Sequence, residues 1–153
     1  ASLDFERSGI AQFSWNRRNI EELAQISKSA PVNGQYSYEG SLVRHNLSEL
    51  WTANEAGRMI AYKIGWMQHT GLVPNKEASI SKLMGSEIAQ QIANLGVKIT
   101  GNYGLLDIGS HLRVLDGRLG REWMDSISFT LRAGTSEIQR NIIATRGLGL
   151  PRG

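Results

Sequence analysis

The stretch ISKLMGSEIAQQIANLGVKI, residues 80–99, carries the clearest structural signal in this chain. Its large apolar residues recur every three or four positions: Ile80, Met84, Ile88, Ile92, Leu95 and Ile99. This spacing gathers their side chains on one side of an α-helix, which has 3.6 residues per turn. We therefore predict an amphipathic helix that begins near Asn75 and packs its apolar side against other helices.

The segments on both sides of this helix have similar spacing. This spacing of apolar residues predicts four further helices, at about residues 3–28, 42–69, 119–129 and 135–146. The apolar residues expected to face the core in the first two are Ile10, Phe13, Ile20, Leu23, Val43, Leu47, Leu50 and Trp51. Residues 30–41 contain proline and glycine and are predicted to be a loop. Because the connections are short, we expect an all-α fold, an antiparallel bundle of about four helices.

Composition limits the classes of function. The chain has 153 residues, of which 41% are hydrophobic and 20% charged, as in an ordinary folded domain. The net charge of +3 is spread along the chain, so we expect no nucleic-acid partner. The absence of cysteine excludes a disulfide framework and a thiolate nucleophile. Neither a membrane-spanning stretch nor a signal-peptide pattern is present, and we expect a cytoplasmic protein without membrane contact.

Residue types that carry chemistry form no constellation of their own. His45, His69 and His111 are far apart in the sequence, and none has a second metal ligand at helical spacing. The sequence contains no nucleophile elbow, phosphate-binding loop or dinucleotide fingerprint. Composition and spacing alone predict a helical bundle without a metal and without an assigned function.

The segment LRAGTSEIQRNIIATRGLGLPR, residues 131–152, begins the last predicted helix. Thr135 or Ser136 can cap that helix, and Ser136 with Gln139 has the spacing of a capping box. Gly134 permits close approach of another group to the backbone, and free amides at a helix start attract polar or anionic groups. On these residues alone, a well-formed helix start explains the pattern.

Three segments together resemble the C-terminal helical domain of the acyl-CoA dehydrogenase family. They are LDFERSGI at residues 3–10, VKITGNYGLL at 97–106 and RAGTSEIQRNIIATRGLGLPR at 132–152. They occur in the order of the family and at similar separations. The resemblance implies that residues 1–153 form one helical domain of an enzyme whose N-terminal helical domain and central β-domain lie outside this chain.

The resemblance implies α,β-dehydrogenation of an acyl-CoA thioester, with FAD accepting a hydride and an electron-transfer flavoprotein accepting the electrons. In many members the α-proton acceptor is the Glu of a Tyr-Glu-Gly-Thr sequence, where this chain has Arg132-Ala133-Gly134-Thr135. One branch of the family carries that Glu on the first helix of the domain, at the position of Glu6. We expect Glu6 to be the catalytic base, beside the Ala133–Gly134 turn. The alternative is an ordinary acidic residue at a helix start.

Further roles follow from the resemblance position by position. Ala133 and Gly134 supply backbone to the site for the thioester oxygen, and Asp4 and Arg7 match positions near the substrate. The residues that match FAD contacts are Thr135 and Glu137, with Lys98, Gly101 and Asn102 reaching the FAD of a neighbouring subunit. These matches imply a homo- or hetero-oligomer, a dimer or tetramer joined through the bundle.

One departure from the family keeps other functions open. The segment SKSAPVNGQYSYEGS, residues 27–41, lacks the Arg-x-x-Phe-Gly pattern that reaches the FAD pyrophosphate in many members. A dissimilar partner subunit that completes the site would suit this loss. The alternatives are a non-catalytic helical subunit of a heteromeric dehydrogenase and a relative that works as a flavin oxidase or monooxygenase. As a dehydrogenase domain without its β-domain, the 153 residues alone are expected to show little or no dehydrogenation.

Overall fold

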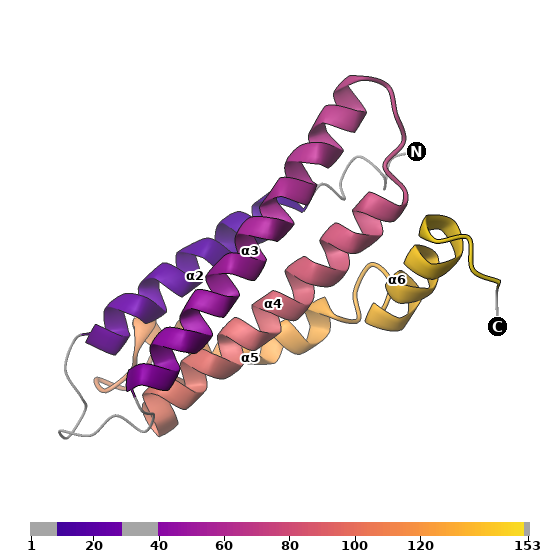
Figure 1. Ribbon diagram of the computed structural model, residues 1–153. Helices are drawn as coiled ribbons and strands as arrows, with labels where there is room; N and C mark the ends of the chain where they lie inside the picture. The colour runs from indigo at the N-terminus through magenta and orange to yellow at the C-terminus, as the bar shows by residue number, and fades with distance from the viewer. Residues whose placement is uncertain (1–8, 29–39, 152–153) are drawn as a thin grey trace.

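The computed structural model describes residues 9–28 and 40–151, which fold almost entirely into helices and contain no β-strand (Figure 1). The helices are α2 (Ile10–Lys28), α3 (Gly40–His69), α4 (Lys76–Thr100), α5 (Arg118–Phe129) and α6 (Ser136–Ile142). Short 3₁₀ turns at Gly101–Leu105 and Leu115–Gly117 lie between α4 and α5, and a π-helical turn, Ile143–Gly147, follows α6. The expected all-α antiparallel bundle is confirmed.

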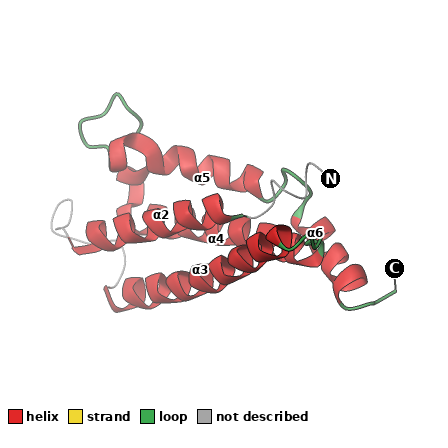
Figure 2. Cartoon of the chain, turned by 90° about the horizontal axis from the view of Figure 1, so that it is seen from above, coloured by secondary structure: helices red, strands yellow, loops and turns green. Residues whose placement is uncertain are grey.

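The helix α4 is the centre of the bundle and contacts α2, α3, α5 and α6. It runs antiparallel to α3, to which residues 70–75 join it (Figure 1). Seen from above, α2 and α3 lie along α4 while α5 forms a further layer beyond α2 and α4 (Figure 2). Within the described residues, no helix is both long and apolar enough to cross a membrane.

The apolar stripe of α4 forms the middle of the core, as its spacing predicts. Ile88, Ile92, Leu95 and Ile99 are buried, whereas Met84 is only half-buried at its edge. They pack against side chains that α2 and α3 turn inward: Phe13, Ile20, Leu23, Val43, Leu47 and Leu50. Complete burial of one such side chain stabilises the fold by about 1.5–3 kcal/mol, so this contact holds the three long helices together.

Close helix approach in the core depends on small residues around Phe13, which is fully buried. A Cβ atom on Gly57 of α3 would lie 2.2 Å from the Phe13 ring, so only glycine fits there. Two buried asparagines then join the helices through the backbone. Asn54 Nδ2 donates to Phe13 O at 3.1 Å, and Asn16 Nδ2 donates to Gly85 O at 3.1 Å.

Candidate functional site

The connection between α5 and α6 contains an unusual backbone turn. Ala133 has φ +56° and Gly134 has φ +95°. The left-handed region suits glycine, but a residue with a Cβ pays about 1 kcal/mol or more to occupy it. Contacts elsewhere in the turn must therefore hold Ala133 in this conformation.

Two side chains from different helices bind the carbonyl oxygens of this turn. Gln139 Nε2 on α6 donates to Ala133 O at 3.1 Å and, more weakly, to Gly134 O at 3.4 Å. Lys82 Nζ on α4 donates to Gly134 O at 2.6 Å and lies 3.5 Å from Thr130 O. We call Lys82 and Gln139 the carbonyl clamp.

The clamp determines the direction of the amides in the turn. In a trans peptide the N–H points opposite to the preceding C=O. Since Ala133 O faces Gln139 and Gly134 O faces Lys82, the N–H groups of Gly134 and Thr135 point away from those side chains. In the described part of the chain, the amides of residues 133–135 donate to no acceptor. They are available to an oxygen of a bound molecule.

The start of α6 confirms one expectation and corrects another. Thr135 is the N-cap, and its hydroxyl accepts a hydrogen bond from Ile138 N at 3.3 Å. The predicted Ser136–Gln139 capping box is wrong, because the Gln139 amide binds the carbonyls of the turn instead. Ser136 is buried, and its Oγ has no partner among the described residues.

The acidic residue of the motif, Glu137, is exposed next to this cap. A hydrogen bond from the Thr135 hydroxyl, followed by one from its own backbone amide, lowers the pKa of the Glu137 carboxyl. It is therefore a carboxylate at neutral pH, which can accept hydrogen bonds but repels a phosphate.

The start of α2 lies beside the same part of α4. A Cβ atom on Gly9 would be 2.2 Å from Ser81 Oγ, and Ser81 is the residue before Lys82. The described chain begins at this contact. Asp4, Glu6 and Arg7, which the sequence assigns to the reacting centre, lie outside the described residues.

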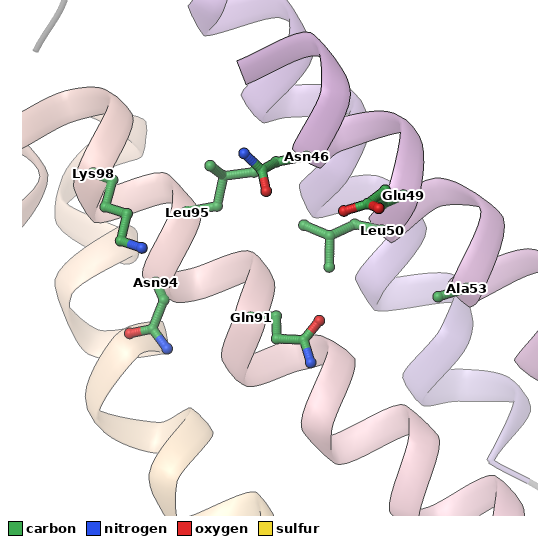
Figure 3. A pocket seen from close by; sticks show the side chains of 8 residues that line it. All are labelled: Asn46, Glu49, Leu50, Ala53, Gln91, Asn94, Leu95 and Lys98. Atoms are coloured by element: carbon green, nitrogen blue, oxygen red, sulfur yellow. The ribbon is translucent and has the colours of Figure 1, made fainter. Parts of the chain in front are cut away.

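Lys98, Gly101 and Asn102 lie at the opposite end of α4 from the clamp. Lys82 and Lys98 are separated by about 24 Å along the helix, at 1.5 Å per residue. Lys98 lines a groove of about 340 Å³ between α3 and α4 (Figure 3). Polar side chains form most of its lining: Asn46, Glu49, Gln91, Asn94 and Lys98. The two predicted sets of FAD contacts are therefore not brought together in one chain.

The clamp itself was not predicted. Lys82 carries no sequence signal, because a lysine on a helix is most often a solvated surface charge. Gln139 was assigned to a different hydrogen bond. Its distance of only a few residues from a glycine-containing turn is the one feature that pointed toward the site.

Fold and turn together define this protein as a helical-bundle domain whose last helix is preceded by backbone donors that have no acceptor in residues 9–28 and 40–151. Residues 1–148 match the family profile described as "Acyl-CoA dehydrogenase, C-terminal domain". The chain belongs to the acyl-CoA dehydrogenase family through this domain, and the predicted resemblance is confirmed.

Two curated relatives show how much of such a protein is present. The acyl-CoA dehydrogenase IpdE1 of Mycobacterium tuberculosis is 28% identical over 158 aligned residues, covering 99% of this chain and 37% of that protein. The caffeyl-CoA reductase-Etf complex subunit CarC of Acetobacterium woodii is 25% identical, covering 94% of this chain and 36% of that protein. The chain thus spans little more than a third of the length of these relatives.

Two solved structures have the same fold. The Tcur3481-Tcur3483 steroid ACAD superposes with a TM-score of 0.85 at 25% identity, over 100% of this chain and 39% of that chain. The prolyl acyl carrier protein oxidase AnaB superposes with a TM-score of 0.79 at 31% identity, over 97% of this chain and 38% of that chain.

Proposed function

We propose that these residues are the C-terminal helical domain of an FAD-dependent acyl-CoA dehydrogenase that removes the α-proton of an acyl-CoA thioester with Glu6. The observation that carries this proposal is the clamped turn at Ala133–Gly134, whose amides have no acceptor among the described residues. Removal of the α-proton pushes negative charge onto the thioester oxygen. Fixed backbone donors stabilise that charge more than they stabilise the neutral carbonyl, and this difference accelerates the step.

The position of α2 supports Glu6 as the base. Gly9 contacts Ser81, and the next residue of α4, Lys82, binds the turn. Glu6 precedes Gly9 by three residues, a length of chain that reaches about 10 Å at most. A carboxylate tethered this closely can serve the same crevice as the amides. To act as a base it needs a pKa raised toward the working pH by desolvation.

The residues around the turn fit part of a flavin cofactor. A pocket of about 320 Å³ adjoins the turn and is lined by Gln90, Gln91, Ser136, Glu137 and Arg140, among others. The amides of Gln90 and Gln91 are donors for a polar group, together with the Arg140 guanidinium, which pairs with Glu87 on the same lining. FAD, when bound, accepts the hydride from the β carbon of the substrate. The negative charge of the Glu137 carboxylate favours contact with hydroxyl groups over contact with phosphate.

The groove at the other end of α4 fits a second role in the assembly. Because Lys98 and Lys82 are about 24 Å apart on one helix, we infer that Lys98, Gly101 and Asn102 serve the flavin of a neighbouring subunit. The Lys98 ammonium can approach a phosphate as a point charge. Glu49, also in the groove, opposes this attraction, so the neutral amides of Asn46, Gln91 and Asn94 complete the proposed contact.

The electron acceptor and the oligomer are parts of the same proposal. CarC is named as a subunit of a complex with Etf, and the steroid ACAD is named for two chains. For this protein we propose electron transfer to an electron-transfer flavoprotein and an oligomer of like or unlike subunits joined through the bundle. A cytoplasmic location stays a prediction from the sequence.

Replacement of the proposed base tests the reaction. In the full-length protein with FAD, Glu6→Gln is expected to lower kcat with an acyl-CoA by at least about hundredfold, because the amide cannot take the α-proton. Glu21→Gln is the matched control, since Glu21 is an exposed residue of α2 paired with Arg17. Near-normal turnover by the Glu6 variant would refute its role and favour a non-catalytic subunit.

An oxidase is the second candidate function. The observation that favours it is the likeness to AnaB, which is named as an oxidase and is 31% identical to this chain. Oxygen consumption distinguishes an oxidase from a dehydrogenase. An oxidase passes the electrons of its substrate to oxygen, whereas a dehydrogenase passes them to a partner flavoprotein. We expect reduction of electron-transfer flavoprotein to be much faster than consumption of oxygen.

A further inference from the structure

The carbonyl clamp does not itself contact the proposed substrate. It can affect the reaction only through the direction in which the backbone N–H groups of the turn point. We propose that Lys82, together with Gln139, is a positioning residue that keeps the amides of Gly134 and Thr135 directed toward the acyl carbonyl oxygen. This inference rests on the proposed function and names what makes its oxygen-binding turn rigid.

The turn has an alternative conformation that the clamp opposes. That alternative is rotation of the two peptides that flank Gly134, which glycine permits because it occupies positive and negative φ at low cost. The same rotation would turn the Gly134 N–H toward Gln139 and the carbonyl toward the substrate. A carbonyl dipole in that place would repel the negative charge that develops on the thioester oxygen.

Lys82 opposes this rotation because its bond is short and charge-assisted. The distance from Nζ to Gly134 O is 2.6 Å, and a hydrogen bond from an ammonium is roughly twice as strong as one between neutral groups. The side chain leaves α4, which contacts all the other described helices and is therefore the most constrained element of the bundle. Its second contact, with Thr130 O at 3.5 Å, reaches the other end of the turn.

Gln139 completes the clamp from α6. Its side chain is almost fully buried, with 2% of the residue exposed. Water therefore cannot replace the carbonyl oxygens of the turn as hydrogen-bond acceptors for the Gln139 amide. Nε2 shares its hydrogen atoms between Ala133 O and Gly134 O. A Cβ on Gly134 would lie 2.6 Å from this nitrogen, so the small residue permits the contact.

The test compares two ligands of the full-length, FAD-loaded protein that differ only in the carbonyl oxygen. One is an unreactive acyl-CoA thioester, and the other is the matching S-alkyl-CoA thioether. Lys82→Met removes the donor but keeps an unbranched side chain. We expect it to weaken thioester binding by about tenfold to hundredfold, as misplacement of a binding group does. Thioether binding should stay unchanged, which also establishes that the variant is folded.

Two further variants complete the design. Lys82→Arg keeps a charged donor and should recover most of the preference for the thioester, whereas Lys28→Met, an exposed lysine at the end of α2, should change neither affinity. Turnover of a reactive acyl-CoA by Lys82→Met should fall in kcat more than it rises in KM, because the donors matter most when charge has developed.

The outcomes separate this inference from the proposed function. Equal losses for thioester and thioether in Lys82→Met, or no loss for either, would overturn the positioning role alone. A wild-type protein that binds thioester and thioether equally well would overturn the oxygen-binding turn, and the proposed function and this inference would both fall.

Discussion

Two glycines in the middle of α3 have opposite surroundings. Gly57 lies against the buried ring of Phe13, where a Cβ would approach to 2.2 Å, while a Cβ on Gly65 would meet nothing within 4 Å. We predict that Gly57→Ala lowers the free energy of unfolding by about 1–3 kcal/mol through overpacking. Gly65→Ala should raise it by up to about 1 kcal/mol, because alanine favours the helix. Denaturant unfolding of both variants measures the difference, and equal effects would contradict the packing around Phe13.

The sequence predicted large core residues but not the small and polar ones beside them. Phe13, Ile20 and Leu23 lie inward because helical spacing determines which side of a helix they share. Whether Gly57 faces a close neighbour depends on a helix far away in sequence, and Asn16 and Asn54 are buried only because backbone carbonyls of other helices meet them. The spacing of apolar residues predicts neither the close neighbour of Gly57 nor the burial of the two asparagines.

At the scale of elements, the sequence predicted the helices well and their end contacts less well. The second predicted helix, residues 42–69, differs by two residues from α3 (Gly40–His69), and the predicted helix at residues 119–129 is nearly α5. The last helix is shorter than predicted, because a π-helical turn replaces it from Ile143. The carbonyls that Gln139 binds belong to a folded-back turn, which spacing along one helix cannot reveal.

An ion-pair cluster that links α5 to α2 contains a carboxyl group expected to be pH-sensitive. Arg118 of α5 forms ion pairs with Glu22 of α2 and with Glu122 one turn later, whose Oε1 lies 2.9 Å from Arg118 Nε. Burial raises the pKa of the Glu122 carboxyl above 4.5, although Arg118 opposes the shift. The folded state therefore binds this proton more tightly than the unfolded state does. Its contribution to stability is present below the unfolded pKa and is lost as pH rises through the folded one.

Replacement of Glu122 isolates this contribution. The melting temperature of wild type relative to Glu122→Gln should fall as pH rises from about 4 to 7, the range just above an ordinary carboxyl pKa, since glutamine is always neutral. Glu21→Gln serves as the control, because Glu21 is exposed and forms its ion pair with Arg17 within α2. A pH-independent difference between wild type and Glu122→Gln would show that burial does not disfavour this carboxylate.

For the whole molecule, α4 determines how far apart the two candidate sites lie. One end holds the donor turn through Lys82, and the other presents Lys98 in the groove shared with α3. Periodicity predicted this helix but could not assign its ends to different sites, because that requires the positions of α3 and α6. The resemblance alone suggested that residues 98–102 serve a neighbouring subunit, and the separation along α4 agrees with that proposal.

An exposed apolar stripe on α3 indicates where such a subunit can bind. Met59, Tyr62 and Trp66 are 56%, 50% and 59% exposed, and Lys63 lies among them. The four positions Met59, Tyr62, Lys63 and Trp66 are spaced symmetrically along the helix, so the spacing is the same when it is read from either end. In an antiparallel two-fold contact, Met59 therefore meets Trp66 of a second copy while Tyr62 meets Lys63, two favourable pairings. We expect Trp66→Glu to shift the full-length protein toward a smaller species in sedimentation experiments, because the contact would bury a carboxylate against Met59 of the second copy. Leu42→Glu, at an exposed apolar position near the start of the same helix, should leave the assembly intact. An unchanged assembly in Trp66→Glu would remove the two-fold contact from the proposal, because that contact could not tolerate a carboxylate in place of the Trp66 ring.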